Sequence, residues 1–129
     1  MTDPRPHLTP ARRIRLRRTK GWRLPPGAIS CCRPSRLGNP FTVRHHGLAQ
    51  AVALHRTWLT TKDASTLGYG PLETSWLNAE RLAVLALLPA LRGHDLACWC
   101  PEPAPYEPDI CHAATLLELA NAPLRCEAV

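Results

Sequence analysis

The sequence predicts a small single-domain α/β sandwich with a short, mostly parallel sheet. Three observations support this: a basic segment that alternates with apolar residues, two helical patterns that follow it, and a later strand pattern before a last helix. The order is β-β-α-α-β-α, and helices that cross between strands favour at least one parallel pair. A chain of 129 residues is long enough to bury one core.

The first two strands are expected in the basic front of the chain. Arginines alternate with Ile14 and Leu16 over residues 13–18, which is the period-two pattern of a half-buried strand. A short apolar run at residues 28–32 predicts a second, more buried strand. Residues 33–41 are rich in Pro, Gly and Asn and therefore predict a loop.

Two helices are expected next. Residues 47–61 have the apolar spacing of a helix, and Pro71 suits the first turn of a longer, strongly apolar one. Pro89 should kink this second helix or start a new short turn. Trp58 and Trp76 are both expected in the core, on helical faces.

The last strand is predicted at residues 95–100, and Asp109 is expected to cap a final helix that ends near Asn121. In open parallel sheets, ligands gather beyond the carboxyl ends of the strands. We therefore expect the loop at 33–41 and the segment at 98–100 to meet at one edge of the sheet.

The predicted domain spans residues 12–122, between a basic, Pro-rich disordered tail at 1–11 and a short tail at 123–129. No run approaches the roughly 18 apolar residues of a membrane span, and the N-terminus is too polar for a signal peptide. The six cysteines lack the spread-out spacing of a secreted disulfide framework. These features predict a cytoplasmic protein with no membrane partner.

The net charge of +6 is unevenly distributed. Residues 1–44 carry eleven Lys and Arg against one Asp, a net +10, whereas residues 45–129 carry five against nine acidic residues, a net −4. A basic front half points to the phosphates of a nucleotide or nucleic acid, or else to an ordinary solvated strand face. The residues that could follow a nucleic-acid backbone, with Trp22 stacking on a base, are Arg12, Arg13, Arg15, Arg17, Arg18, Lys20 and Arg23.

Four potential metal ligands lie within fifteen residues. Cys98 and Cys100 share a face if their segment is a strand, and Cys111 and His112 open the last helix, where free backbone N–H groups favour a thiolate. This set suits a tetrahedral Cys₃His zinc site, or a nucleophilic Cys111 beside an acid–base His112. The third interpretation is buried, inert thiols. Against metal binding, neighbouring residues of a helix point about 100° apart.

The loop offers a second candidate site, because guanidinium, hydroxyl and backbone N–H groups together can hold a phosphate. It has neither a dinucleotide fingerprint nor a Walker lysine. In the alternative interpretation its arginines pair with carboxylates of the back half. The candidate ligand-binding residues are Arg33, Ser35, Arg36, Gly38 and Asn39.

Arg-Pro-Ser-Arg at 33–36, Gly-Asn-Pro-Phe at 38–41, Cys-Trp-Cys-Pro at 98–101 and Cys-His at 111–112, in this order, resemble the bacterial and phage family DUF4326. The similarity covers roughly residues 12–121. It implies a compact intracellular domain, and the family's phage members associate it with nucleotide or nucleic-acid metabolism.

Two functions follow from the sequence. One is a small domain that binds a phosphate-bearing ligand and carries a zinc-binding Cys/His cluster. The alternative is a nucleotide-processing enzyme, a hydrolase or a glycosyl-bond-cleaving enzyme, in which Cys111 or His112 is catalytic and Arg33 holds the phosphate. A structural protein whose basic half docks on an acidic partner is a third possibility.

Overall fold

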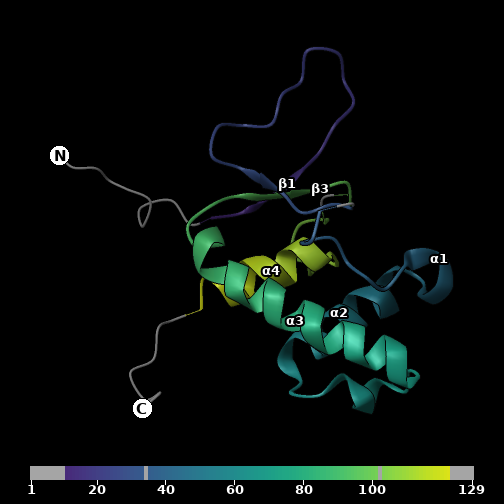
Figure 1. Ribbon diagram of the computed structural model, residues 1–129. Helices are drawn as coiled ribbons and strands as arrows, with labels where there is room; N and C mark the ends of the chain where they lie inside the picture. Colours follow the sequence, from purple (N-terminus) through teal and green to yellow (C-terminus); the bar gives the residue numbers. More distant parts are fainter. Residues whose placement is uncertain (1–10, 34, 102, 123–129) are drawn as a thin grey trace.

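The computed structural model describes residues 11–122 except 34 and 102, so the predicted tails lie outside the described residues apart from Ala11. Within this part, three strands form one all-parallel sheet in the order β1-β3-β2 (Figure 1). They are β1 (Arg13–Arg15), β2 (Ile29–Ser30) and β3 (Leu96–Cys98). The central strand β3 is buried throughout, and the predicted α/β class with a short parallel sheet is confirmed.

The strands are shorter than expected because the central one is short. Arg13 pairs with Leu96 and Arg15 with Cys98, and the amide of Leu16 donates to the Cys98 carbonyl at 2.9 Å. Beyond Cys98 the chain bends, so β1 loses its partner and the remaining arginines of the predicted strand lie in a loop.

Helices make up about half of the remaining described residues. They are α1 (Val43–His46), α2 (Leu48–Thr60), the 3₁₀ helix η2 (Ala64–Leu67), α3 (Pro71–Leu91) and α4 (His112–Ala120). Pro89 lies inside α3 rather than ending it, and Gly93, with φ 83°, follows the helix as a left-handed residue. None of the described helices is both long and apolar enough to cross a membrane.

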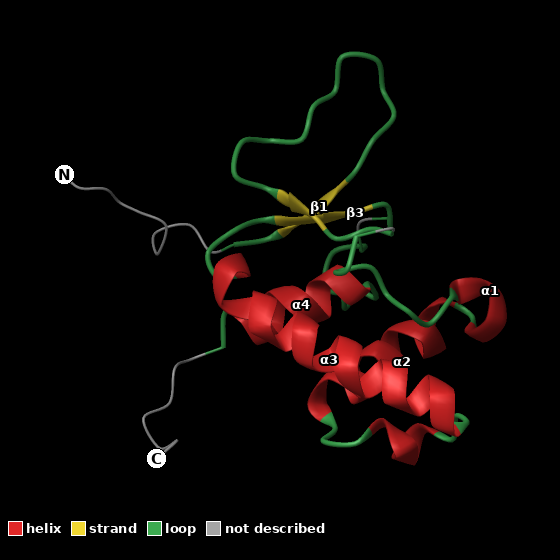
Figure 2. Ribbon diagram, in the orientation of Figure 1, coloured by secondary structure: helices red, strands yellow, loops and turns green. Residues whose placement is uncertain are grey.

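The helices lie on one side of the sheet, and the loop between β1 and β2 rises on the other (Figure 2). Trp58 is 1% exposed and its indole N–H donates to the Leu77 carbonyl at 3.0 Å, so it occupies the core as expected. Trp76 does not, since 54% of it is exposed. Leu77 and Val84 lie on the buried face of α3. Trp76 precedes Leu77 and is therefore rotated by about 100° away from that face.

Candidate metal centre

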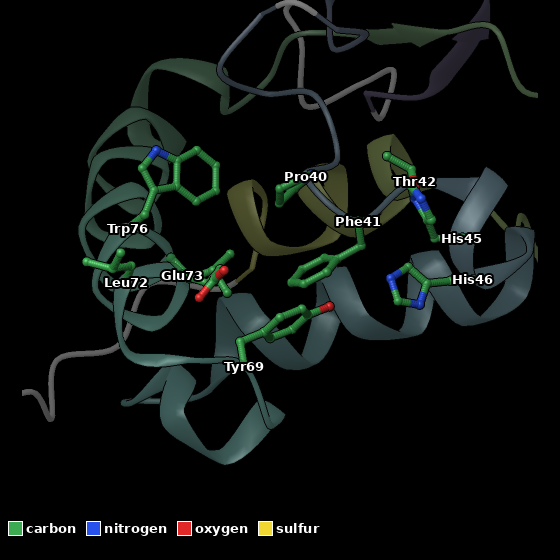
Figure 3. Close-up of a pocket in the computed structure, with 10 residues that line it drawn as sticks. Pro40, Phe41, Thr42, His45, His46, Tyr69, Leu72, Glu73 and Trp76 are labelled. Atoms are coloured by element: carbon green, nitrogen blue, oxygen red, sulfur yellow. The ribbon is translucent and has the colours of Figure 1, made fainter.

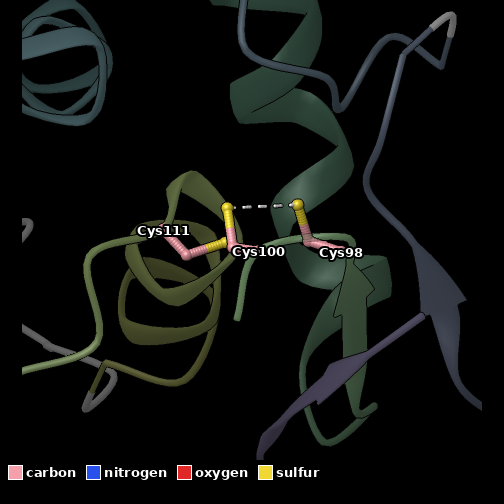
Figure 4. A group of neighbouring side chains, drawn as sticks. All are labelled: Cys98, Cys100 and Cys111. Atoms are coloured by element: carbon pink, nitrogen blue, oxygen red, sulfur yellow. Dashed lines mark hydrogen bonds between the residues drawn. The ribbon is translucent and has the colours of Figure 1, made fainter. Parts of the chain in front are cut away.

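Two elements that meet at the carboxyl edge of the sheet supply the Cys/His cluster, and Figure 4 shows its three cysteines. Cys98 is the last residue of β3, and Cys100 follows two positions later in a bend. Cys111 is the N-cap of α4, and His112 is the first residue of that helix. Cys111 has φ −156° and ψ 139°, an extended conformation. The adjacent pair therefore avoids the divergence that two successive helical residues would have.

The three sulfur atoms of Cys98, Cys100 and Cys111 all lie within 4.8 Å of one another. The Sγ atoms of Cys98 and Cys100 are 3.9 Å apart, and Nδ1 of His112 is also 3.9 Å from Sγ of Cys98. Zinc–sulfur bonds of about 2.3 Å at tetrahedral angles put neighbouring sulfurs about 3.8 Å apart. The cluster could therefore hold a metal ion with little rearrangement.

The imidazole of His112 is oriented by a backbone carbonyl. Its Nε2 lies 2.6 Å from the oxygen of Cys31, and because a carbonyl only accepts, Nε2 carries the proton. Nδ1 is then the nitrogen that faces Cys98. Metal-bound histidines commonly hold their second nitrogen in this way, which fixes the ring and its tautomer.

The electrostatics of the cluster favour one thiolate and one imidazolium. Hydrogen bonds from the thiols of Cys100 and Cys111 hold the pKa of Cys98 far below its ordinary value. Hydrogen bonds of Cys111 to Cys100 and to Cys98, together with burial, raise the pKa of the Cys111 thiol. Burial lowers the pKa of His112, but hydrogen bonds to Cys111 and Cys98 outweigh it and raise that pKa to about 10. A divalent cation would take the place of the shared protons.

A buried arginine holds the chain between the two cysteine pairs. The guanidinium of Arg13 donates to the carbonyls of Cys100 and Pro101 at 2.8 and 2.7 Å. It also donates twice to the carboxylate of Asp109, at 2.7 and 2.9 Å. Asp109 is therefore not the helix cap that the sequence predicts, because its carboxylate is engaged by Arg13 and Cys111 takes the cap position.

The basic residues of the front half have different surroundings. Arg13 points into the protein, with only 4% of its side chain exposed, so it is not available to a nucleic-acid backbone. The guanidinium of Arg18 lies 4.7 Å from the ring centroid of Trp99, a cation–π contact at the surface. Trp99, between Cys98 and Cys100, is 43% exposed.

The candidate phosphate loop is partly bonded to itself. Asn39, only 6% exposed, donates to the Ala51 carbonyl at 3.0 Å and accepts from the Phe41 amide at 2.9 Å. Nε of Arg33 donates to the Asn39 carbonyl at 2.8 Å, and the Ser35 hydroxyl accepts from the Leu37 amide at 3.0 Å. Asn39 and Ser35 thus shape the loop.

The two remaining loop residues are also constrained. Nε of Arg36 donates to Glu80 at 2.9 Å, which is the pairing with a back-half carboxylate that the alternative interpretation describes. A Cβ on Gly38 would lie 2.8–3.0 Å from three atoms of Arg33, two of them backbone, so this close approach requires glycine.

Two hollows are lined by residues of the loop, and one of them also reaches the cluster. One, of about 280 Å³, is lined by Arg33 and Asn39 on one side and by Cys98, Cys100 and His112 on the other. The expected meeting of the loop with the end of β3 is therefore confirmed. The other, of about 310 Å³, includes all five candidate loop residues, namely Arg33, Ser35, Arg36, Gly38 and Asn39.

A larger hollow, of about 720 Å³, was not expected from the sequence (Figure 3). Its aromatic lining comes from the end of the loop, the turn before α3 and α3 itself, through Phe41, Tyr69 and Trp76. Residues so far apart in the chain share no local spacing, so no sequence signal unites them.

His55, which shares the inward face of α2 with Ala51 and Trp58, is 1% exposed. Its ring packs edge-on against His112, with the centroids 5.5 Å apart, and Nδ1 has no hydrogen-bond partner within the described residues. Burial, and then the neighbouring His112, lower its pKa to about 3. The neutral imidazole of His55 therefore packs against His112, one of the potential ligands.

The fold and the cluster define a small α/β domain with a cysteine-rich set of potential metal ligands at its sheet edge. The family model described as Domain of unknown function (DUF4326) matches residues 14–122, and the chain belongs to this family. The resemblance seen in the sequence motifs is thereby confirmed. No curated protein and no solved structure matches the chain.

Proposed function

We propose that the protein is a zinc-containing domain that binds a phosphate-bearing ligand, a nucleotide or nucleic acid, beside the metal. The observation that carries the metal assignment is the mutual approach of three sulfurs within 4.8 Å, with the imidazole of His112 alongside. Thiolate-rich sets with one imidazole and tetrahedral spacing suit zinc better than the harder cations, which prefer oxygen. The four ligands are Cys98, Cys100, Cys111 and His112.

The zinc is proposed to be structural. Four protein donors fill a tetrahedral site and leave no position for a substrate. Cys111 is completely buried and His112 is 8% exposed, so direct contact with a substrate is disfavoured for both. The raised pKa of Cys111 likewise disfavours it as the nucleophile of a nucleotide-processing enzyme. The metal would fasten β3 to the start of α4 and so position the nearby loop.

Arg33 is the proposed phosphate anchor. It lines both small hollows, and within the described residues only its Nε is committed to a hydrogen bond, leaving the terminal nitrogens of the guanidinium. Two parallel N–H donors match two phosphate oxygens. Arg36 lies in the same hollow, where its Nε is paired with Glu80 and its terminal nitrogens have no hydrogen-bond partner within the described residues.

Cobalt replacement tests the metal assignment. Co²⁺ in the site should give the strong visible absorption of a tetrahedral complex and near-ultraviolet bands from sulfur ligands. Replacing Cys100 with serine should reduce the sulfur bands, and replacing Cys32, which lies outside the cluster, should not. The assignment would be refuted by the weak spectrum of an octahedral complex, or by near-ultraviolet bands whose intensity does not change in Cys100→Ser.

Phosphate binding is tested with pyrophosphate on the zinc-loaded chain. The Arg33→Ala variant should weaken binding by about tenfold or more, since a charge-assisted hydrogen bond is lost. Arg44→Ala is the matched control, because Arg44 is an exposed arginine of α1 that lines none of the three hollows. Equal effects of the two substitutions would show general charge attraction instead of a site.

A further inference from the structure

We propose that the large aromatic hollow binds the base of a guanine nucleotide whose phosphates lie at Arg33 and Arg36. The inference rests on the phosphate site proposed above and identifies its ligand. Three features carry it: the aromatic walls of the hollow, a single carboxylate at its rim, and walls shared with the hollow that contains the arginines.

The walls are suited to a flat ring. Figure 3 shows the indole of Trp76 on one side of the space and the rings of Phe41 and Tyr69 on the other. Phe41 is held in place by contacts with Tyr69 and the buried Trp58, at centroid distances of 6.0 and 5.9 Å. Trp76 lies outside the core, with 54% of it exposed, so its ring is accessible for stacking on a base.

Exposed apolar residues cluster at the same place. Leu72, one turn before Trp76 on α3, is 84% exposed and also lines the hollow. Large exposed apolar side chains around a concave surface are typical of ligand-binding sites. A base inserted beside Trp76 would cover this surface.

Glu73 provides the polar recognition. It is the one acidic residue of the lining, and within the described residues it has no hydrogen-bond or ion-pair partner. Its Oε1 lies near Gly70 at the start of α3.

An ionised carboxylate accepts two parallel hydrogen bonds but donates none. Guanine presents two adjacent donors, N1–H and the 2-amino group, on its pairing edge. Adenine and cytosine place a ring-nitrogen acceptor beside their amino group, and uracil flanks its single N–H with two carbonyls. Glu73 therefore selects guanine.

The base and phosphate sites are adjacent. The aromatic hollow shares Pro40 and Trp76 with the hollow that contains Arg33 and Arg36. One ligand can thus lie along the segment from Arg33 to Phe41, with its base towards Glu73 and its phosphates towards the arginines. The charges at the two ends have the signs that such a ligand requires.

The experiment is calorimetric titration of the full zinc-loaded chain with GDP, ADP, guanosine and pyrophosphate. We expect GDP to bind about tenfold or more tightly than ADP, because a bidentate contact discriminates between bases by that order. Guanosine should bind more weakly than GDP but measurably.

Two variants separate the base from the phosphate. Trp76→Ala should weaken GDP about tenfold or more and pyrophosphate far less, since stacking on an aromatic ring is lost. Glu73→Gln should abolish the preference for GDP over ADP. Leu82→Ala, at a 63% exposed position of the same helix outside the hollow, is the control.

The outcomes distinguish the two proposals. One outcome is that pyrophosphate binds, that GDP binds no more tightly than ADP, and that Trp76→Ala does not change GDP binding. This outcome overturns the guanine site and leaves the phosphate site standing. Guanosine binding that depends on Trp76 and Glu73 without pyrophosphate binding supports the base site and refutes the phosphate site. Binding of none of the four ligands overturns both.

Discussion

The guanidinium of Arg13 and the carboxylate of Asp109, ninety-six positions apart in the chain, are joined by two hydrogen bonds of 2.7 and 2.9 Å. The same guanidinium donates to the carbonyls of Cys100 and Pro101. One side chain of β1 thereby fixes both ends of the loop that separates Cys100 from Cys111. The geometry of the cluster depends on this contact as well as on its own ligands.

Replacing Arg13 with alanine should lower the free energy of unfolding by roughly 2–4 kcal/mol, since it leaves Asp109 and two carbonyls without their partner. Arg15→Ala removes the same charge from an exposed position of the same strand and should cost about 0.5 kcal/mol or less. Chemical denaturation of the zinc-loaded proteins measures both. Equal losses would show that the Arg13 contacts contribute nothing specific.

Gly38 should tolerate alanine poorly. The added Cβ would meet backbone atoms of Arg33 at 2.9 and 3.0 Å, so the loop must shift, at a cost of about 1–3 kcal/mol. Gly70→Ala is the matched control, because the only close atom there is the carboxylate oxygen of Glu73, at the end of a flexible side chain. A thermal melt of Gly38→Ala that matches Gly70→Ala would contradict the close-packing argument.

Zinc affinity should rise with pH. The bound thiolates and imidazole must be free of protons at the metal, so binding releases protons and acid competes with it. Each released proton adds about a tenfold increase in affinity per pH unit while its group is still protonated in the free protein. Competition with a chromophoric chelator between pH 6 and pH 8, about two units, measures the slope. Cys32→Ser should keep the slope and Cys100→Ser should reduce it, whereas a flat profile would exclude thiolate ligation.

The sequence predicted those parts of the fold that depend on local patterns. Strand alternation around Ile14 and helical spacing around Trp58 identified the α/β class. Parallel topology then placed Cys98 near the 33–41 loop, because the carboxyl ends of parallel strands share an edge. That inference required no side-chain detail.

The rest depended on tertiary contacts. Asp109 has the residue type of a helix cap, but its partner Arg13 comes from the opposite end of the chain, and no local rule identifies that competitor. The exposure of Trp76 depends on which face of α3 meets the core, and several apolar stripes of this helix were possible. The burial of His55 follows from the position of α4, which the sequence does not specify.

The metal content of the protein, purified without a histidine tag, tests the central claim most directly. We expect native mass spectrometry and elemental analysis to find about one zinc per chain, lost on denaturation, as for structural zinc sites. Cys98→Ser should lose the metal and melt at a lower temperature, and Cys32→Ser should keep both metal and stability. A fully folded protein without zinc that takes up none when zinc is supplied, with the melting temperature of Cys98→Ser unchanged, would contradict the account.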